Sequence, residues 1–87
     1  MLISKEAIFN MKIGAKGEQL RFLQQVEVLI GLYKEDYFVN ELNKSISKLN
    51  SLVELEKRAD PHRKAEVTAE INKIKKTIKN LNFILCK

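Results

Sequence analysis

One run of residues near the C-terminus constrains the fold more than any other. Apolar residues recur there at intervals of 4, 3, 4, 3 and 4, at Val67, Ile71, Ile74, Ile78, Leu81 and Leu85. This spacing places them along one stripe of a helix of about seven turns. Asp60 is suited to cap the helix and Pro61 to begin it. We therefore predict a helix over residues 61–85.

The preceding stretch, residues 35–57, carries the same pattern. Leu42, Ile46, Leu49 and Val53 are spaced 4, 3 and 4, which predicts a second long helix with one apolar stripe. Only residues 58–60 lie between the two helices, and so short a link makes neighbouring helices antiparallel. Because the seven-residue spacing runs through both, we expect a long hairpin that packs like a short antiparallel coiled coil.

The N-terminal part completes the predicted fold. Residues 18–33 carry a strong amphipathic pattern that predicts a third main helix, and we expect it to cover the open side of the hairpin. Residues 1–13 would suit a strand, but Ile3, Ala7, Ile8 and Met11 follow helical spacing, and we favour a short helix begun at Ser4. Gly14 and Gly17 mark the loop between the two helices. The predicted fold class is all-α, with a single helical domain over residues 1–87.

Charge is distributed unevenly along the chain. Residues 1–43 hold five Lys or Arg against six acidic residues, whereas residues 44–87 hold eleven against five. The two halves therefore carry −1 and +6, which add to the net +5 of the whole chain. Such asymmetry indicates an anionic partner for the second half. Nucleic acid, an acidic protein surface and anionic lipid all meet that description.

Five basic residues gather where the hairpin turns, and we call this set the hairpin tip: Lys57, Arg58, His62, Arg63 and Lys64. Cations in the first turn of a helix oppose the helix dipole, which favours anions there. The sequence breaks this local preference, so we interpret the tip as a candidate binding site for a partner or an anion, helped by the helix N-terminal amides. The competing interpretation is a solvated turn whose charges serve solubility.

A second basic feature is the lysine row, which we define as Lys73, Lys76 and Lys79. If Ile71, Ile74 and Ile78 face the hairpin, these lysines point outward on the last helix. They would attract phosphate groups, but no aromatic residue lies among them, and the side chains that read bases are scarce there. The row therefore fits an ordinary solvated face or a non-specific phosphate contact.

Residues that could carry catalysis are few. His62 is the only histidine and Cys86 the only cysteine, and neither has a helix-spaced partner that would form a metal set or a nucleophile–base pair. No phosphate-binding glycine loop occurs. We predict no enzymatic activity, no cofactor, no metal and no catalytic residue. The single cysteine and the absence of a long apolar run favour a cytoplasmic protein, and they argue against a membrane partner.

These observations lead to a functional expectation. We expect a non-catalytic interaction module, such as an adaptor, an assembly factor or a small inhibitor of the kind that phages and mobile elements encode. Its expected partner is a protein with an acidic surface, bound through the basic hairpin. The alternative is a nucleic-acid-binding protein that uses phosphate contacts from the last helix and the tip. The sequence also leaves open whether the protein forms a homo-oligomer. It likewise leaves open whether Phe83 packs in the core or forms an interface.

Overall fold

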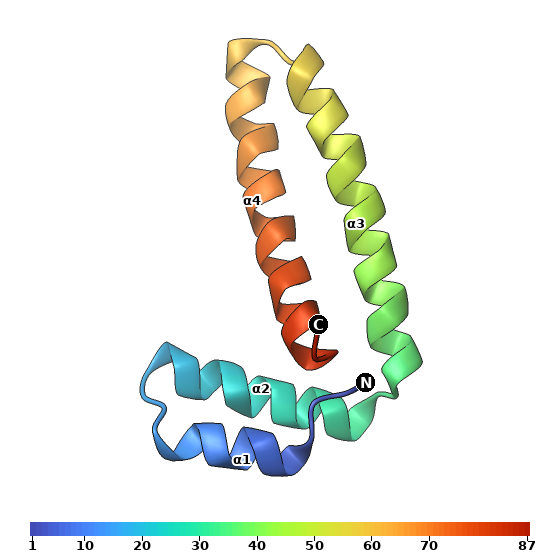
Figure 1. Cartoon of the computed structure of the whole chain (residues 1–87). Helices are drawn as coiled ribbons and strands as arrows, with labels where there is room; N and C mark the ends of the chain where they lie inside the picture. Colours follow the sequence, from blue (N-terminus) through green and yellow to red (C-terminus); the bar gives the residue numbers. More distant parts are fainter.

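The computed structural model describes all residues 1–87 as four helices without strands: α1 (Lys5–Ile13), α2 (Glu18–Leu32), α3 (Glu35–Arg58) and α4 (Pro61–Ile84) (Figure 1). The predicted all-α class is confirmed. The helix bounds differ from the predicted ones by one residue at three C-terminal ends, since α2 and α4 end one residue earlier than expected and α3 ends one residue later.

The helix starts follow the capping signals in the sequence. The Ser4 hydroxyl accepts a hydrogen bond from the backbone N–H of Ala7 at 3.1 Å, and Asp60 Oδ1 accepts one from the N–H of Arg63 at 2.9 Å. Each side chain satisfies an N–H group that has no partner within its helix. Gly17 precedes α2 with φ of 63°, in the left-handed region that glycine adopts without strain.

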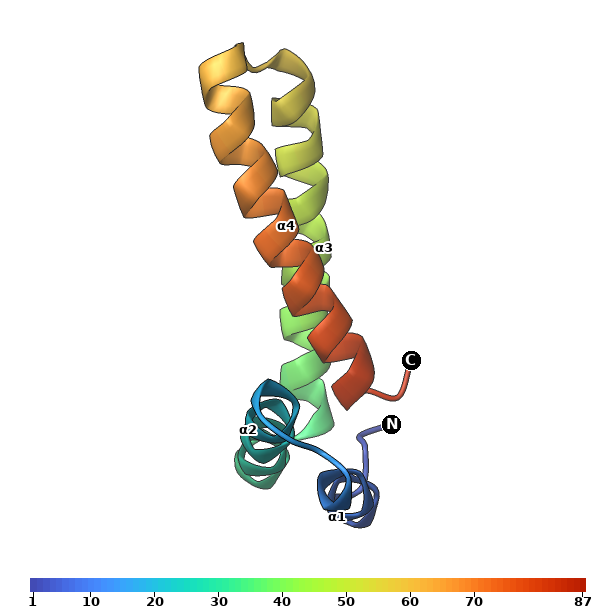
Figure 2. The same ribbon diagram turned by 90° about the vertical axis from the view of Figure 1, so that its left-hand side faces the viewer.

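The helices form two hairpins of unequal length. In the longer hairpin, α3 and α4 lie antiparallel and side by side, and we call this hairpin the arm (Figure 1). The shorter α1–α2 hairpin, which we call the base, lies across the open end of the arm (Figures 1 and 2). The expectation that the helix of residues 18–33 covers the open side of the hairpin is therefore wrong. Tyr33 and Lys34 are extended, with ψ of 151° and 168°, and this break turns the chain between α2 and α3.

The largest group of buried residues lies where the arm meets the base. It draws on all four helices and both chain ends: Ile3, Ile8, Ala15, Leu23, Val26, Phe38, Leu42, Leu81, Ile84 and Leu85. The backbone N–H of Ile3 donates to the carbonyl oxygen of Ile84 at 2.8 Å, which ties the two ends together. Phe83 packs on Phe22 with ring centroids 5.4 Å apart. The sequence left open whether Phe83 packs in the core or forms an interface, and in the structure it packs against α2.

Along the arm only two helices pack together. Val67, Ile71 and Ile74 of the predicted stripe are buried. Ile46 and Leu55 of α3 remain 41% and 45% exposed, because no third helix lies beside them. Across the arm, the Thr68 hydroxyl donates to Glu56 Oε2 at 2.7 Å, and this charge-assisted bond links α4 to α3.

Replacing Asp60 with alanine should lower the free energy of unfolding by about 0.5–2 kcal/mol, because the Arg63 N–H would lose its acceptor. Asp60→Ser is the matched control, since serine also provides a capping oxygen and should retain most of the stability. Chemical denaturation followed by circular dichroism measures the free energy of unfolding of both variants. Equal stability of the alanine and wild-type proteins would show that the cap contributes nothing.

Candidate partner-binding site

The hairpin tip is formed by the last turn of α3 and the first turn of α4, at the end of the arm farthest from the base (Figure 1). All five of its basic side chains are exposed. Lys57 forms an ion pair with Glu54 at 3.5 Å, and none of the other four forms an ion pair within the chain. Exposed pairs of this kind contribute at most about 1 kcal/mol, so a partner can displace Glu54 readily.

The link between the arm helices brings Arg58 and Arg63 to one surface hollow of about 490 Å³. Its apolar floor is Leu52, Leu55, Ala59 and Val67, and its remaining lining is acidic: Asp60, Glu66 and Glu70. The sequence alone did not indicate that these carboxylates lie beside the arginines. Lys57, His62 and Lys64 do not line the hollow. The outer surface of the tip therefore carries basic side chains, whereas the hollow is lined by both basic and acidic side chains.

Two backbone N–H groups at the start of α4 already have acceptors within the chain, both from Asp60. Asp60 Oδ1 already accepts the N–H of Arg63, and the Asp60 carbonyl oxygen accepts the N–H of Lys64 at 2.8 Å. The carboxylate also complements the positive end of the helix dipole. An anion at the tip would consequently be bound by the basic side chains and not by these two backbone amides.

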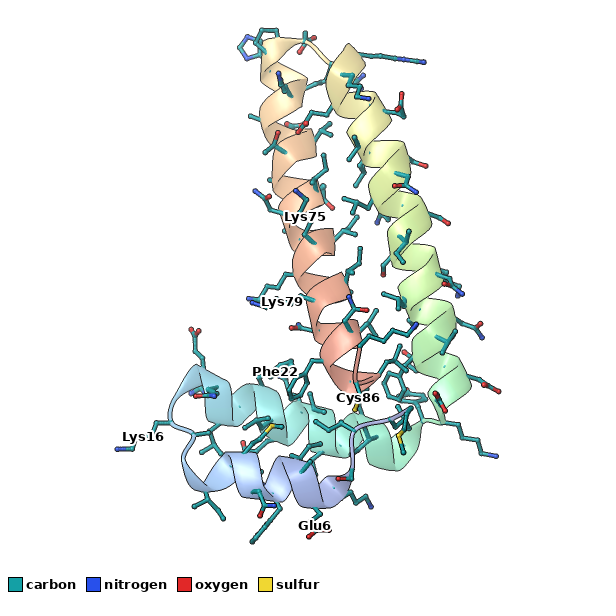
Figure 3. All side chains as sticks on the ribbon, in the orientation of Figure 1. Glu6, Lys16, Phe22, Lys75, Lys79 and Cys86 are labelled. Atoms are coloured by element: carbon teal, nitrogen blue, oxygen red, sulfur yellow. The ribbon has the colours of Figure 1, made fainter.

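The lysine row lies on the exposed surface of α4. Lys73 forms an ion pair with Glu70 at 3.6 Å, while Lys76 and Lys79 form none. Figure 3 shows Lys79 extending from α4 on the side away from α3. Positions 62 and 73 fall on one helix face because 11 residues make about three turns. His62 of the tip is thus aligned with the lysine row.

Sequence reasoning missed a second hollow, of about 470 Å³, in the corner between α2 and α4. Lys76 and Asn80 of α4 line it together with four polar residues and one aromatic residue of α2: Glu18, Gln19, Arg21, Gln25 and Phe22. Arg21, like Lys76, has no ion-pair partner in the chain. Nothing in the sequence signalled this corner, because it depends on the turn between α2 and α3.

The side chains with catalytic or metal-binding chemistry are dispersed. No group of three His, Cys, Asp or Glu side chains is arranged to hold a metal ion. His62 lies in the first turn of α4, and the exposed Cys86 follows the other end of the same 24-residue helix. A helix of that length spans about 36 Å, so the two side chains do not meet. No helix combines the length and the apolar content needed to cross a bilayer.

Comparison with known proteins returns no matching family model, no matching curated protein and no matching solved structure.

Proposed function

We propose that the protein is a non-catalytic interaction module that binds an acidic surface of a protein partner through its arm. One observation carries the proposal. Of the eight basic residues in the tip and the lysine row, six are exposed and have no ion-pair partner in the chain: Arg58, His62, Arg63, Lys64, Lys76 and Lys79. Unpaired lysine and arginine side chains on a projecting element steer and orient an oppositely charged partner.

The hollow beside the tip favours a protein over a nucleic acid as the partner. Asp60, Glu66 and Glu70 would repel acidic groups of any partner, and a nucleic-acid backbone has no cation to place against them. The same carboxylates can pair with lysine or arginine of a protein, and Leu52 and Leu55 supply apolar area of the kind that protein interfaces bury. Within this proposal the protein acts in the cytoplasm as an adaptor, an assembly factor or a small inhibitor, and needs no cofactor.

The test is recovery of a partner from cells that express the protein with an affinity tag. Arg58, Arg63 and Lys64 are replaced together by Glu, and recovery should fall by about tenfold or more, because rim cations become repulsive toward an acidic surface. The matched control replaces Lys5, Lys34 and Lys87 by Glu. This control variant changes the net charge by the same amount as the tip variant, but its three substitutions are at exposed positions outside the tip. Equal recovery by the wild-type and tip-reversed proteins would contradict the proposed site.

The corner between α2 and α4 supports the second candidate, binding of nucleic acid through phosphate contacts. Arg21 and Lys76 line that hollow together with Gln19, Gln25, Asn80 and the ring of Phe22, and Glu18 is its one acidic residue. Electrophoretic mobility shifts at two salt concentrations separate the candidates. Nucleic-acid binding through several cations should weaken steeply as salt rises, and an absence of binding at about 50 mM salt would exclude it.

A further inference from the structure

The hollow beside the tip is a groove that runs between the two arm helices. On the α4 side it is lined by a charged row within the helix, Arg63, Glu66 and Glu70. These residues are spaced 3 and 4, so they lie along one face of α4. Seven residues of a helix rise by about 10 Å, and the groove therefore has room for about two turns of a further helix.

The α3 side of the groove is apolar and is left uncovered by the chain. Leu52 and Leu55 lie three residues apart on α3, and Leu55 is 45% exposed. Val67 of α4 is buried at the floor between the helices. The base lies at the opposite end of the arm, so no third helix reaches the groove (Figures 1 and 2). Apolar grooves of this kind bind the apolar face of an amphipathic helix.

The charged row determines which helix is complementary to the groove. Along α4 from the tip, the cation Arg63 is followed by the anions Glu66 and Glu70. Arg63 and Glu66 form no ion pair in the chain, and Glu70 pairs only with exposed Lys73 at 3.6 Å. An exposed pair of this kind contributes little and exchanges readily. A complementary helix therefore carries an acidic residue opposite position 63 and basic residues opposite positions 66 and 70.

We propose that the protein partner inserts an amphipathic helix into this groove and converts the end of the arm into a three-helix bundle. Its apolar face packs on Leu52, Leu55 and Val67. Its edge beside α4 carries an acidic residue followed by two basic residues. This order also suits the dipole of the partner helix when it runs parallel to α4, with its acidic residue nearer its N-terminus. The inference rests on the proposed function and specifies the chemistry of the partner.

Titration of the full chain with a fluorescently labelled synthetic peptide tests the proposal. The probe is an amphipathic peptide of about 18 residues with leucines on one helix face. One edge of that face carries Glu followed by two Lys, at the spacing of residues 63, 66 and 70. The peptide should bind with a Kd of about 100 µM or tighter and gain helix content in circular dichroism. A peptide with Glu and Lys exchanged is the control and should bind at least about tenfold more weakly.

Variants of the chain locate the peptide in the groove. Leu55→Glu should weaken binding by about tenfold or more, because it places a charge against the apolar face of the peptide. Ile46→Glu, at a similarly exposed position of α3 outside the groove, is the matched control and should leave binding unchanged. Arg63→Glu combined with Glu66→Lys and Glu70→Lys inverts the charged row, so this variant should prefer the exchanged peptide. Equal affinity of the wild type for both peptides, or no binding up to about 1 mM, would overturn the proposal.

Recovery of the cellular partner separates a failure of this inference from a failure of the proposed function. Loss of recovery by the tip-reversed protein, with full recovery by Leu55→Glu, would support the proposed function and overturn the groove. Equal recovery by the wild-type and tip-reversed proteins would contradict the proposed function, whereas the peptide titration would still decide whether the groove binds a helix. A dimer of the chain alone that Leu55→Glu disrupts, measured by sedimentation equilibrium, would identify a second copy as the occupant and would also overturn the proposal.

Discussion

Replacing Phe38 with alanine should lower the free energy of unfolding by about 3–5 kcal/mol, the range for a buried aromatic residue. The Phe38 side chain is 1% exposed at the joint between base and arm. Its ring lies edge-on to Tyr37 at 5.3 Å and to Tyr33 at 6.3 Å, and the two tyrosine rings stack at 4.0 Å. Alanine would leave a cavity beneath both rings and loosen the turn between α2 and α3.

Chemical denaturation of the Phe38→Ala protein measures this loss. A domain of this size is stable by only about 4–13 kcal/mol, so a loss of this size takes a large share of its stability and should clearly lower the denaturant concentration at the midpoint of unfolding. Ile46→Ala, on the same helix but at a 41% exposed position, is the matched control and should cost less than about 1 kcal/mol. Similar losses for the two variants would contradict the placement of Phe38 in the core.

Replacing Leu85 with alanine should cost about 2–5 kcal/mol although the residue lies only two positions from the end of the chain. Chain ends ordinarily tolerate change. Leu85, however, is 1% exposed and belongs to the central cluster with Ile3 and Ile84. Its backbone N–H also donates to the Leu81 carbonyl oxygen at 2.9 Å, which fixes the turn that directs the side chain inward.

Thermal and chemical unfolding of the Leu85→Ala protein test this prediction, with Lys87→Ala as the control at the exposed terminal residue. A small loss, similar to that of the control, would mean that the last residues are not part of the core. The expected large loss would show that the C-terminal residues stabilise the junction of base and arm.

The helices could be predicted because their signals are local. Ser4 and Asp60 act as caps through bonds to residues three positions ahead, and the stripe from Val67 to Leu85 needs only helical periodicity. The antiparallel arm follows from the short link before Pro61. The predicted outward lysines are likewise exposed, because the buried stripe determines which side of α4 faces solvent.

The position of the base could not be predicted in the same way. It depends on the extended backbone at Tyr33 and Lys34 and on the burial of Phe38, which are set by contacts between helices. Consequently the corner joining Arg21 to Lys76 was missed. The arginine–carboxylate hollow at the tip was missed because it forms between side chains of α3 and α4 on either side of their link.

The two faces of α1 could be predicted in part. The helical spacing of Ile3, Ala7, Ile8 and Met11 separates the buried Ile8 from the exposed Phe9 and Ile13. It does not show that α2 packs against α1, where Lys12 forms an ion pair with Glu27 at 3.3 Å.

Under the proposed function, a protein partner contacts the tip and the outer face of α4. Site-specific photo-crosslinking in cells tests this contact, with a photoreactive residue placed at exposed His62, at exposed Asn72 beside the lysine row, or at exposed Asn43 on α3 as the control. One protein should be crosslinked from positions 62 and 72 and none from position 43. Crosslinking from position 43 alone would contradict it.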